Sequence, residues 1–542
     1  MKIICLFTVA VCLFCYSLLG AQTVSKQTIA QAILDDIADA AGVVQVPKLE
    51  IVNNVPNLVA DYNPNIMPNG LIRLSEKTYD ICHNLQNQFK GALAVILSHE
   101  LMHHYRRHQQ TIGYAFANKS AANPKQVRQT EAEADSLGLF YAYAAGYSVL
   151  TIAPNLLDIL YKNYQFPEKT DNYPSLAERR KTAQNMSKNL QTYAPIWEAS
   201  KCLYILGGYE QAANGFELLV NKLPACKMYY NAGIAWLMAY IANTKPEDAP
   251  YIYPIEIDPT NRFSPERGSS GEISNIRRCL GTKCYIDGIF LQVENNAYLE
   301  KAQKNLQKAT AIDPDYEPAQ MAWAITYHLL GKDGTALDLL DDLLKKDPKN
   351  GNAYCLRAII HSKNKKCEAA TADFNTAITY KGYFAAENKQ LMRTKDGTCW
   401  TWAGWTRDMF PSTTSKNPIR NPDAEMIDGV TCAKLPTASS TNKKPITAGT
   451  WDLKFFDQYA NAYWIKAAKG DLKILATPPN YSGKTAANLS VANSNATDIT
   501  NAYGQPTRKV AAVGGTYWVY NNCRLAFCVD KHERLRGWFL WK

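Results

Sequence analysis

The sequence predicts a chain of mixed architecture, with an α+β domain over residues 22–192, an all-α repeat array over 193–385 and a β-rich domain over 386–542. Three observations lead to this prediction. The first domain holds an apolar helix with two histidines, the second repeats a helical pattern every 34 residues, and the third alternates polar and apolar residues. With 542 residues, of which 46% are hydrophobic, the chain is long enough for several buried cores.

The first 21 residues have the features of a secretory signal peptide. Met1 and Lys2 precede an apolar run over 3–20, which ends at the small residue Ala21. We therefore expect signal cleavage after Ala21 and export, either to the periplasm or out of the cell. The alternative is an uncleaved single N-terminal membrane anchor, since the apolar run is barely long enough to span a bilayer.

The chain has 14 cysteines, and an exported chain is expected to form disulfides. Three of them leave with the signal, so the mature chain keeps 11 and at least one thiol stays free. Spacing does not determine connectivity, but it favours three pairs, namely Cys279 with Cys284, Cys523 with Cys528, and Cys399 with Cys432.

The central motif of the chain is His99-Glu100-Leu101-Met102-His103, which follows an unbroken apolar run over 91–97. Two histidines four positions apart lie on one face of a helix, so both imidazoles can bind one metal ion. Glu100 then lies beside the metal, where it can take a proton from a bound water as a general base. The alternative is a purely structural pair of buried histidines.

A hydrolytic zinc site usually has three protein ligands, and Glu131 is the best candidate for the third. It lies in an alanine-rich predicted helix. Asp135 follows it by one turn on the same face, where it can accept a hydrogen bond from a ligand histidine. We expect the other polar residues nearby to face solvent rather than the metal, namely His104, His108 and Glu133.

Over about residues 27–190, these motifs and two upstream segments, 57–60 and 69–74, resemble a family of zinc peptidases. The family includes the CAAX prenyl protease, the HtpX heat-shock protease and the β-barrel assembly-enhancing protease. The resemblance implies a zincin-like fold with one Zn²⁺ per chain. By motif match, the ligands are His99, His103 and Glu131.

The resemblance also assigns further roles. Glu100 is the base, and Asp135 orients a ligand histidine. The stretch Gly70-Leu71-Ile72-Arg73-Leu74 is implied to be a strand edge to which peptide substrates add as a further strand.

One position departs from the family pattern. Many relatives have a His-Pro pair before a Glu-Arg helix start, whereas this chain has Tyr173-Pro174 before Glu178-Arg179. A phenol can donate a hydrogen bond to an oxyanion, so Tyr173 is a candidate catalytic residue. The alternative is that Tyr173 only packs against the helix that Pro174 opens.

Residues 193–385 follow the 34-residue period of tetratricopeptide repeats. Asp313-Pro314 recurs as Asp347-Pro348, and Ala319 recurs as Ala353. About four helical hairpins are predicted, with an insertion over 244–296 that is rich in proline, glycine and serine. Such arrays bind peptides or partner proteins on their concave face. The alternative is a spacer that braces the peptidase.

Residues 386–542 lose the helical periodicity. Alternating stretches over 516–520 and 524–529 predict paired strands, which a further apolar segment over 536–541 completes. The clustered tryptophans of this domain are expected to lie in its core. Its role is unknown.

Composition and motifs together favour one function. The net charge of +10 is modest, and no basic stripe is interleaved with aromatic residues, so no nucleic-acid partner is expected. We infer an exported zinc endopeptidase that cleaves envelope or secreted proteins in quality control, with repeats that recruit substrates or partners. The resemblance adds membrane and outer-membrane proteins to the expected partners. The alternatives are a non-proteolytic scaffold or chaperone, and a metallohydrolase of small molecules or peptidoglycan.

Overall fold

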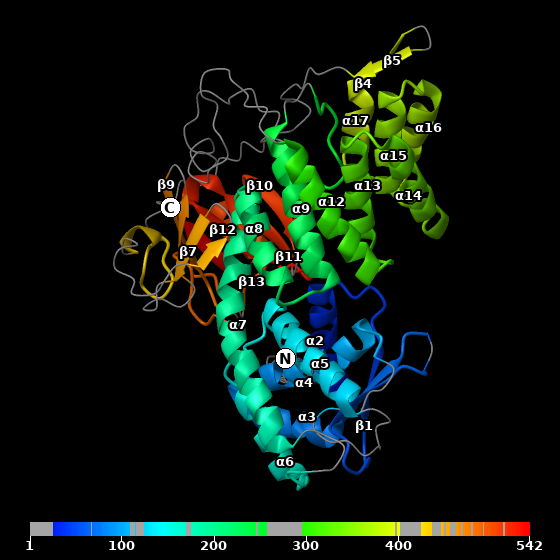
Figure 1. Ribbon diagram of the computed structural model, residues 1–542. Coiled ribbons are helices and arrows are strands. Elements are labelled where there is room, and N and C mark those ends of the chain that lie inside the picture. The colour runs from blue at the N-terminus through cyan, green and yellow to red at the C-terminus, as the bar shows by residue number, and fades with distance from the viewer. Residues whose placement is uncertain are drawn as a thin grey trace, which may run out of the picture. The chain divides into compact units, whose positions relative to one another are not determined.

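A computed structural model of the chain, shown in Figure 1, combines α-helices with β-sheets, as the sequence predicts. The structure describes residues 25–66, 68–108, 114, 124–169, 175–244, 248–256, 295–395, 398–401, 424–435, 446–448, 451–455, 462–467, 470–478, 481–491, 493–512 and 515–542. The predicted signal, Tyr173, Cys279, Cys284 and most of the predicted insertion lie outside the described residues. The chain divides into two compact units.

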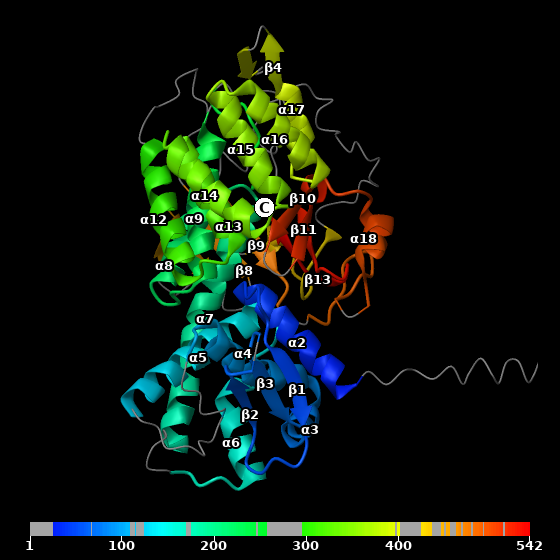
Figure 2. The same cartoon turned by 90° about the vertical axis from the view of Figure 1, so that its right-hand side faces the viewer.

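The first unit contains a three-stranded sheet with the order β1-β3-β2 (Figure 2). β1 (Lys48–Val52) runs parallel to β3 (Leu71–Ser75), and β2 (Ala60–Asn63) runs antiparallel to it. β3 is therefore the central strand, and its apolar residues are buried on both faces. The prediction that residues 70–74 offer a strand edge is wrong, because both sides of this strand are already paired. The edge strands are β1 and β2.

Several helices contribute to the first unit, and one of them is buried on every side. From Gly91 to His103 every residue of α4 is buried, because its sequence has no polar face. The other helices are α2 (Lys26–Ala41), α3 (Glu76–His83), α5 (Pro124–Ala144) and α6 (Ala153–Tyr164), and α4 itself spans Phe89–Tyr105.

Gly138 of α5 allows close contact with α4. A Cβ atom at this position would lie 3.0 Å from the backbone nitrogen of His99. Because even an alanine would crowd that backbone, glycine lets the two helices approach closely at the level of the first histidine.

The second unit contains an array of antiparallel helices, seen side by side in Figures 1 and 2. α15 begins 34 residues after α13, and α16 begins 34 residues after α14, as the sequence period predicts. Gly233 of α9 meets Leu306 of α12, so these two helices pack together across the predicted insertion. The helices are α7 (Leu176–Ile205), of which residues 176–184 belong to the first unit, α8 (Tyr209–Val220), α9 (Cys226–Asn243), α12 (Asn295–Ile312), α13 (Glu317–Leu329), α14 (Asp333–Lys346), α15 (Gly351–Lys363), α16 (Cys367–Thr379) and α17 (Ala385–Leu391).

A short segment of the predicted insertion, residues 249–256, packs against the last helices of this array. The side chain of Asn388 donates to the carbonyl of Ile252 at 2.7 Å and accepts from its N–H at 2.9 Å. The hydroxyls of Tyr251 and Ser362 share a hydrogen bond of 2.5 Å. The chain itself therefore covers the surface around Asn388.

The C-terminal part of the second unit is an eight-stranded antiparallel sheet with the order β10-β11-β12-β13-β9-β8-β7-β6. α18 (Ala496–Tyr503) packs Ile499 and Tyr503 into the core on one face of this sheet. The strands are β6 (Ile446–Ala448), β7 (Trp451–Phe455), β8 (Ala462–Ala467), β9 (Gly470–Ala476), β10 (Arg508–Ala512), β11 (Gly515–Tyr520), β12 (Leu525–Val529) and β13 (Leu535–Trp541). The predicted strands of this region are thus confirmed.

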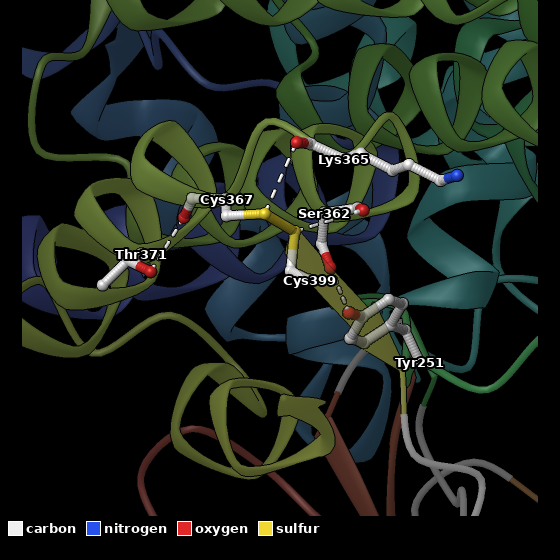
Figure 3. The surroundings of a disulfide bond; sticks show 6 residues. All are labelled: Tyr251, Ser362, Lys365, Cys367, Thr371 and Cys399. Atoms are coloured by element: carbon white, nitrogen blue, oxygen red, sulfur yellow. Dashed lines mark hydrogen bonds between the residues drawn. A yellow bond between two sulfur atoms is a disulfide. The ribbon is translucent and has the colours of Figure 1, made fainter. Parts of the chain in front are cut away.

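A disulfide joins Cys367, at the start of α16, to Cys399 in β5 (Thr398–Thr401), which pairs with β4 (Met392–Lys395) (Figure 3). Two of the pairs that spacing favours are wrong, because no disulfide joins Cys523 to Cys528, and Cys399 is bonded to Cys367 rather than to Cys432. Cys523 belongs to the same buried core as Phe527 of β12. Cys528 follows Phe527 in that strand, so its side chain points to the opposite face of the sheet.

No helix in the described ranges combines the length and the apolar character that crossing a bilayer requires.

Candidate metal centre

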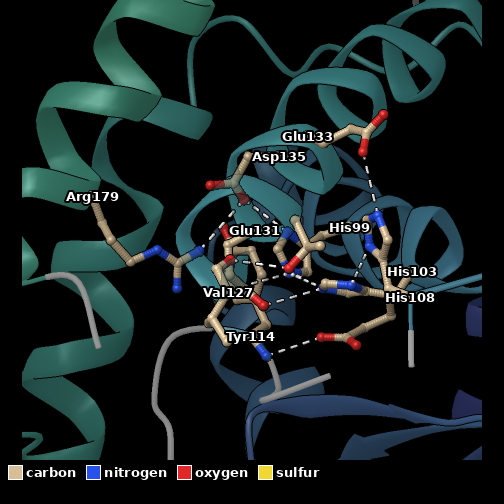
Figure 4. A network of polar contacts seen from close by, with 11 residues as sticks. His99, His103, His108, Tyr114, Val127, Glu131, Glu133, Asp135 and Arg179 are labelled. Carbon is tan, nitrogen blue, oxygen red and sulfur yellow. Dashed lines mark hydrogen bonds and ion pairs between the residues drawn. The ribbon is translucent and has the colours of Figure 1, made fainter. Parts of the chain in front are cut away.

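Three side chains from two helices converge in the interior of the first unit. His99 and His103 project from α4 and Glu131 projects from α5 (Figure 4). The Nε2 atoms of the two histidines lie 3.0 Å apart, and each lies 3.4 Å from a carboxylate oxygen of Glu131. All three residues are buried, and their donor atoms lie within 4.8 Å of one another. Sequence reasoning named these three residues together.

His99 is oriented by a carboxylate behind it. Its Nδ1 atom lies 2.7 Å from Oδ1 of Asp135, and the guanidinium of Arg179 lies 3.4 Å from the same oxygen. A carboxylate accepts but does not donate, so the ring proton of His99 sits on Nδ1 and Nε2 is free to bind a cation. Asp135 follows Glu131 by one helical turn, so a single helix supplies both groups.

The second histidine has a different partner. Nδ1 of His103 lies 2.9 Å from Nδ1 of His108, whose Nε2 lies 3.3 Å from Oε2 of Glu133. His108 is buried, with 9% of its surface exposed, so the prediction that it faces solvent is wrong. Glu133 is partly exposed, as predicted, but its carboxylate also contacts His108. The end of α4 is followed by a turn that brings His108 back under the helix, which helical spacing alone does not reveal.

His104 faces away from this centre. Its Nδ1 shares a hydrogen bond of 2.9 Å with the hydroxyl of Tyr62 in β2, and its Nε2 lies 2.7 Å from the carbonyl oxygen of Gln45. It is therefore no ligand, and it links α4 to the edge strand β2.

Glu100 is fully buried, and it lies close enough to His99 and Glu131 for their charges to affect its pKa. One carboxylate oxygen, Oε1, accepts the backbone N–H of Tyr114 at 2.9 Å. The other, Oε2, has no hydrogen-bond partner in the described part of the chain. Because a buried polar atom without a partner is costly, this oxygen is available to accept a hydrogen bond from a further polar group. Burial also raises the pKa of Glu100 to about 8.

The electrostatics of the centre favour a divalent cation. Although burial opposes its ionisation, the charges of Arg179 and His99 hold the pKa of Asp135 at about 2. Burial likewise opposes the charged form of His99, yet the Asp135 and Glu131 carboxylates raise its pKa to about 10. Burial lowers the pKa of His103 to about 3. The metal-free centre therefore holds a proton that a cation would displace.

The donor set fits zinc. Two imidazole nitrogens and one carboxylate are the ligands of one common class of hydrolytic zinc site, in which the fourth position is left to water. The carboxylate of Glu100, with its unpartnered oxygen, stands next to these ligands as a general base must.

Tyr114 is a site residue that the sequence did not single out. Its ring meets the ring of His99 edge-on, with centroids 5.0 Å apart, and Arg179 lies over its face at 5.1 Å. Its backbone N–H donates to both Oε1 of Glu100 and the carbonyl oxygen of Ala60 in β2, with a distance of 2.9 Å from the nitrogen to each oxygen. Tyr114 belongs to the connection between α4 and α5, where no periodicity or motif distinguishes it. The residue that the sequence did propose as an oxyanion donor, Tyr173, lies outside the described residues.

Glu100 should give the metal-free protein a distinctive pH dependence. Its pKa is about 8 in the folded chain and about 4.5 in an unfolded chain, so between pH 5 and 8 the folded state holds a proton that the unfolded state has lost. The contribution of Glu100 to stability therefore falls as the pH rises through this window. Glutamine has no such titration and still accepts the Tyr114 N–H.

We therefore expect the free energy of unfolding of Glu100→Gln, relative to that of wild type, to rise by on the order of 3 kcal/mol from pH 5 to pH 8. Urea unfolding of chelator-treated proteins at both pH values measures this. A stability difference that is the same at pH 5 and pH 8 would contradict the buried, protonated glutamic acid.

No protein-family model matches the chain, and no curated protein matches it.

Proposed function

We propose that this chain is a zinc-dependent endopeptidase with a zincin-like catalytic domain, similar to the family of the CAAX prenyl and HtpX proteases. The observation that carries the proposal is the convergence of His99, His103 and Glu131 beside a buried Glu100 whose Oε2 has no partner among the described residues. A structural pair of histidines does not require a third ligand or a buried, unpartnered carboxylate oxygen.

The residues divide the chemical work between them. Zinc, when bound, would supply a Lewis acid that activates water and polarises a peptide carbonyl. Glu100 accepts the proton from that water and delivers it to the nitrogen of the leaving amine. A raised pKa suits both halves of this task, because a carboxyl group that binds a proton firmly is also a good base. Asp135 keeps the Nδ1 proton of His99 in place.

The substrate edge is best assigned to β2. β2 is an edge strand, and the bond between Tyr62 and His104 links it to α4. The carbonyl of Ala60 in this strand accepts the backbone N–H of Tyr114, which is the kind of contact that a substrate strand would make along the rest of this edge. An extended peptide beside β2 would thus pass close to Glu100, which accepts the same N–H.

The remaining parts of the proposal concern the setting of the enzyme. The 34-residue helical hairpins are proposed to be tetratricopeptide repeats that recruit substrates or partner proteins, with envelope and outer-membrane proteins as the expected class. The chain is proposed to be exported, either with its signal removed or held by a single N-terminal anchor. Recruitment has to use surfaces other than the one around Asn388, which residues 249–256 cover.

Cleavage of an unstructured protein tests this proposal. Purified protein should cleave fluorescently labelled casein, lose the activity in a zinc chelator such as 1,10-phenanthroline, and regain it when zinc is restored. Cleavage that persists in the chelator would refute a metal-dependent mechanism. A folded, zinc-loaded protein that cleaves neither casein nor a peptide library would favour the scaffold or chaperone alternative.

A further inference from the structure

The two ligand histidines are held from behind by partners of different kinds. Nδ1 of His99 meets the carboxylate of Asp135 directly, at 2.7 Å. Nδ1 of His103 meets a second imidazole, His108, whose Nε2 in turn lies near a carboxylate oxygen of Glu133 (Figure 4). The sequence suggested a role for Asp135, but nothing in the proposed mechanism uses the second arrangement.

We propose that His108 and Glu133 form a positioning relay for His103 and thereby set the affinity of the centre for zinc. This inference rests on the proposed function, because it concerns the same metal centre. His108 and Glu133 are positioning residues, since they act on the metal through the ring of His103.

The proton positions follow from the distances. To bind a cation through Nε2, His103 must carry its ring proton on Nδ1, which then donates to Nδ1 of His108 at 2.9 Å. Nδ1 of His108 must therefore be the acceptor, so the proton of that ring sits on Nε2 and points to Oε2 of Glu133 at 3.3 Å. This arrangement fixes the tautomers of both rings, and it leaves Nε2 of His103 directed at the ligands His99 and Glu131.

The backbone at the end of α4 is built to place His108 there. The N–H of His108 donates to the carbonyl of His103 at 2.9 Å, and the N–H of Arg107 donates to that of His104 at 3.0 Å. These are the two hydrogen bonds of a Schellman motif, and Arg107 has the left-handed φ of 54° that this motif needs. A positive φ is unfavourable for arginine, so the turn is held by its surroundings. It folds the chain back so that His108 lies against His103.

The far end of the relay is also held. Arg106 contacts the carboxylate of Glu133 at 2.5 Å. Glu133 follows Glu131 by two residues on α5. The relay thus connects the two ligand-bearing helices a second time, and it does so on the opposite side of the centre from Asp135. Loss of an outer-shell partner of this kind typically weakens metal binding by about 10–100-fold.

The test compares zinc affinities of the full chain by competition with a chromophoric chelator. His108→Phe keeps a flat ring but removes both nitrogens, and we expect its zinc dissociation constant to rise about 10–100-fold. His108→Asn should lose less, because its amide oxygen lies near the former Nδ1 and still accepts from His103. The matched control is His104→Phe, at the residue next to His103 in α4, whose partners are Tyr62 and Gln45. We expect its affinity to stay within about threefold of wild type.

The outcomes separate the relay from simpler explanations. Equal zinc affinity in His108→Phe and wild type would overturn the inference, as would an equal loss in His108→Phe, His108→Asn and His104→Phe, which would indicate a packing effect. If His108→Phe does not fold, judged by circular dichroism of the metal-free protein, Glu133→Gln decides the question, because it should also bind zinc more weakly than wild type. A wild-type chain that binds no zinc would instead refute the proposed function.

Discussion

Glu100→Gln should abolish peptide cleavage while leaving the fold and zinc binding intact. Glutamine has the size of glutamate and still accepts the N–H of Tyr114, but it cannot accept a proton from water. A positioned general base contributes about 10²–10⁴-fold to the rate, and here it also returns the proton to the leaving group. We therefore expect kcat/KM to fall by about three orders of magnitude or more, measured with a fluorogenic peptide.

The control for this variant is its zinc content, which should equal that of wild type. Glu100 is no ligand in the arrangement described, so a loss of zinc together with activity would assign it a different role. Cleavage at the wild-type rate by a zinc-loaded Glu100→Gln protein would remove the proposed mechanism. Equal biological function of the two proteins would point to the non-proteolytic scaffold.

Glu131→Ala should remove both the metal and the activity. Glu131 is the one anionic ligand of the three, and without it two neutral imidazoles remain, 3.0 Å apart at their Nε2 atoms. Two ligands hold zinc much more weakly than three, so we expect the dissociation constant to rise by a factor of 10³ or more, on the order of 4 kcal/mol. Isothermal titration calorimetry of the metal-free protein with zinc measures the change in the dissociation constant.

Gln129→Ala is the matched control, because Gln129 is exposed on the same helix. It should bind zinc as wild type does. Zinc binding by Glu131→Ala at the wild-type affinity would show that the third ligand lies elsewhere, and the metal centre would then have to be assigned anew.

The cluster of His99, His103 and Glu131 could be predicted from the sequence because its spacing is helical. His99 and His103 lie four apart on one helix, and Glu131 and Asp135 lie four apart on another, so local periodicity determines which side chains share a face. The long-range step, that the two helices meet, came from the need of a hydrolytic zinc site for a third protein ligand, and the family resemblance agreed with it. The structure adds a reason in Gly138, whose missing side chain allows that contact.

Other features depend on contacts that spacing does not encode. His108 reaches His103 through a turn with a left-handed residue, and Tyr114 reaches Glu100 from a connection without periodicity. The order of the three strands is a tertiary property, which is why a segment predicted to be an edge became the central strand β3. The partner of Cys399 proved to be Cys367, because the β4–β5 hairpin folds back to the start of α16.

The zinc content of the purified full-length protein tests the proposed metal centre most directly, measured by inductively coupled plasma mass spectrometry after dialysis against metal-free buffer. We expect about one zinc per chain, with the metal lost when His99 or His103 is replaced by alanine. A correctly folded wild-type protein that contains no zinc, and that takes up none when zinc is added, would contradict the proposed metal centre.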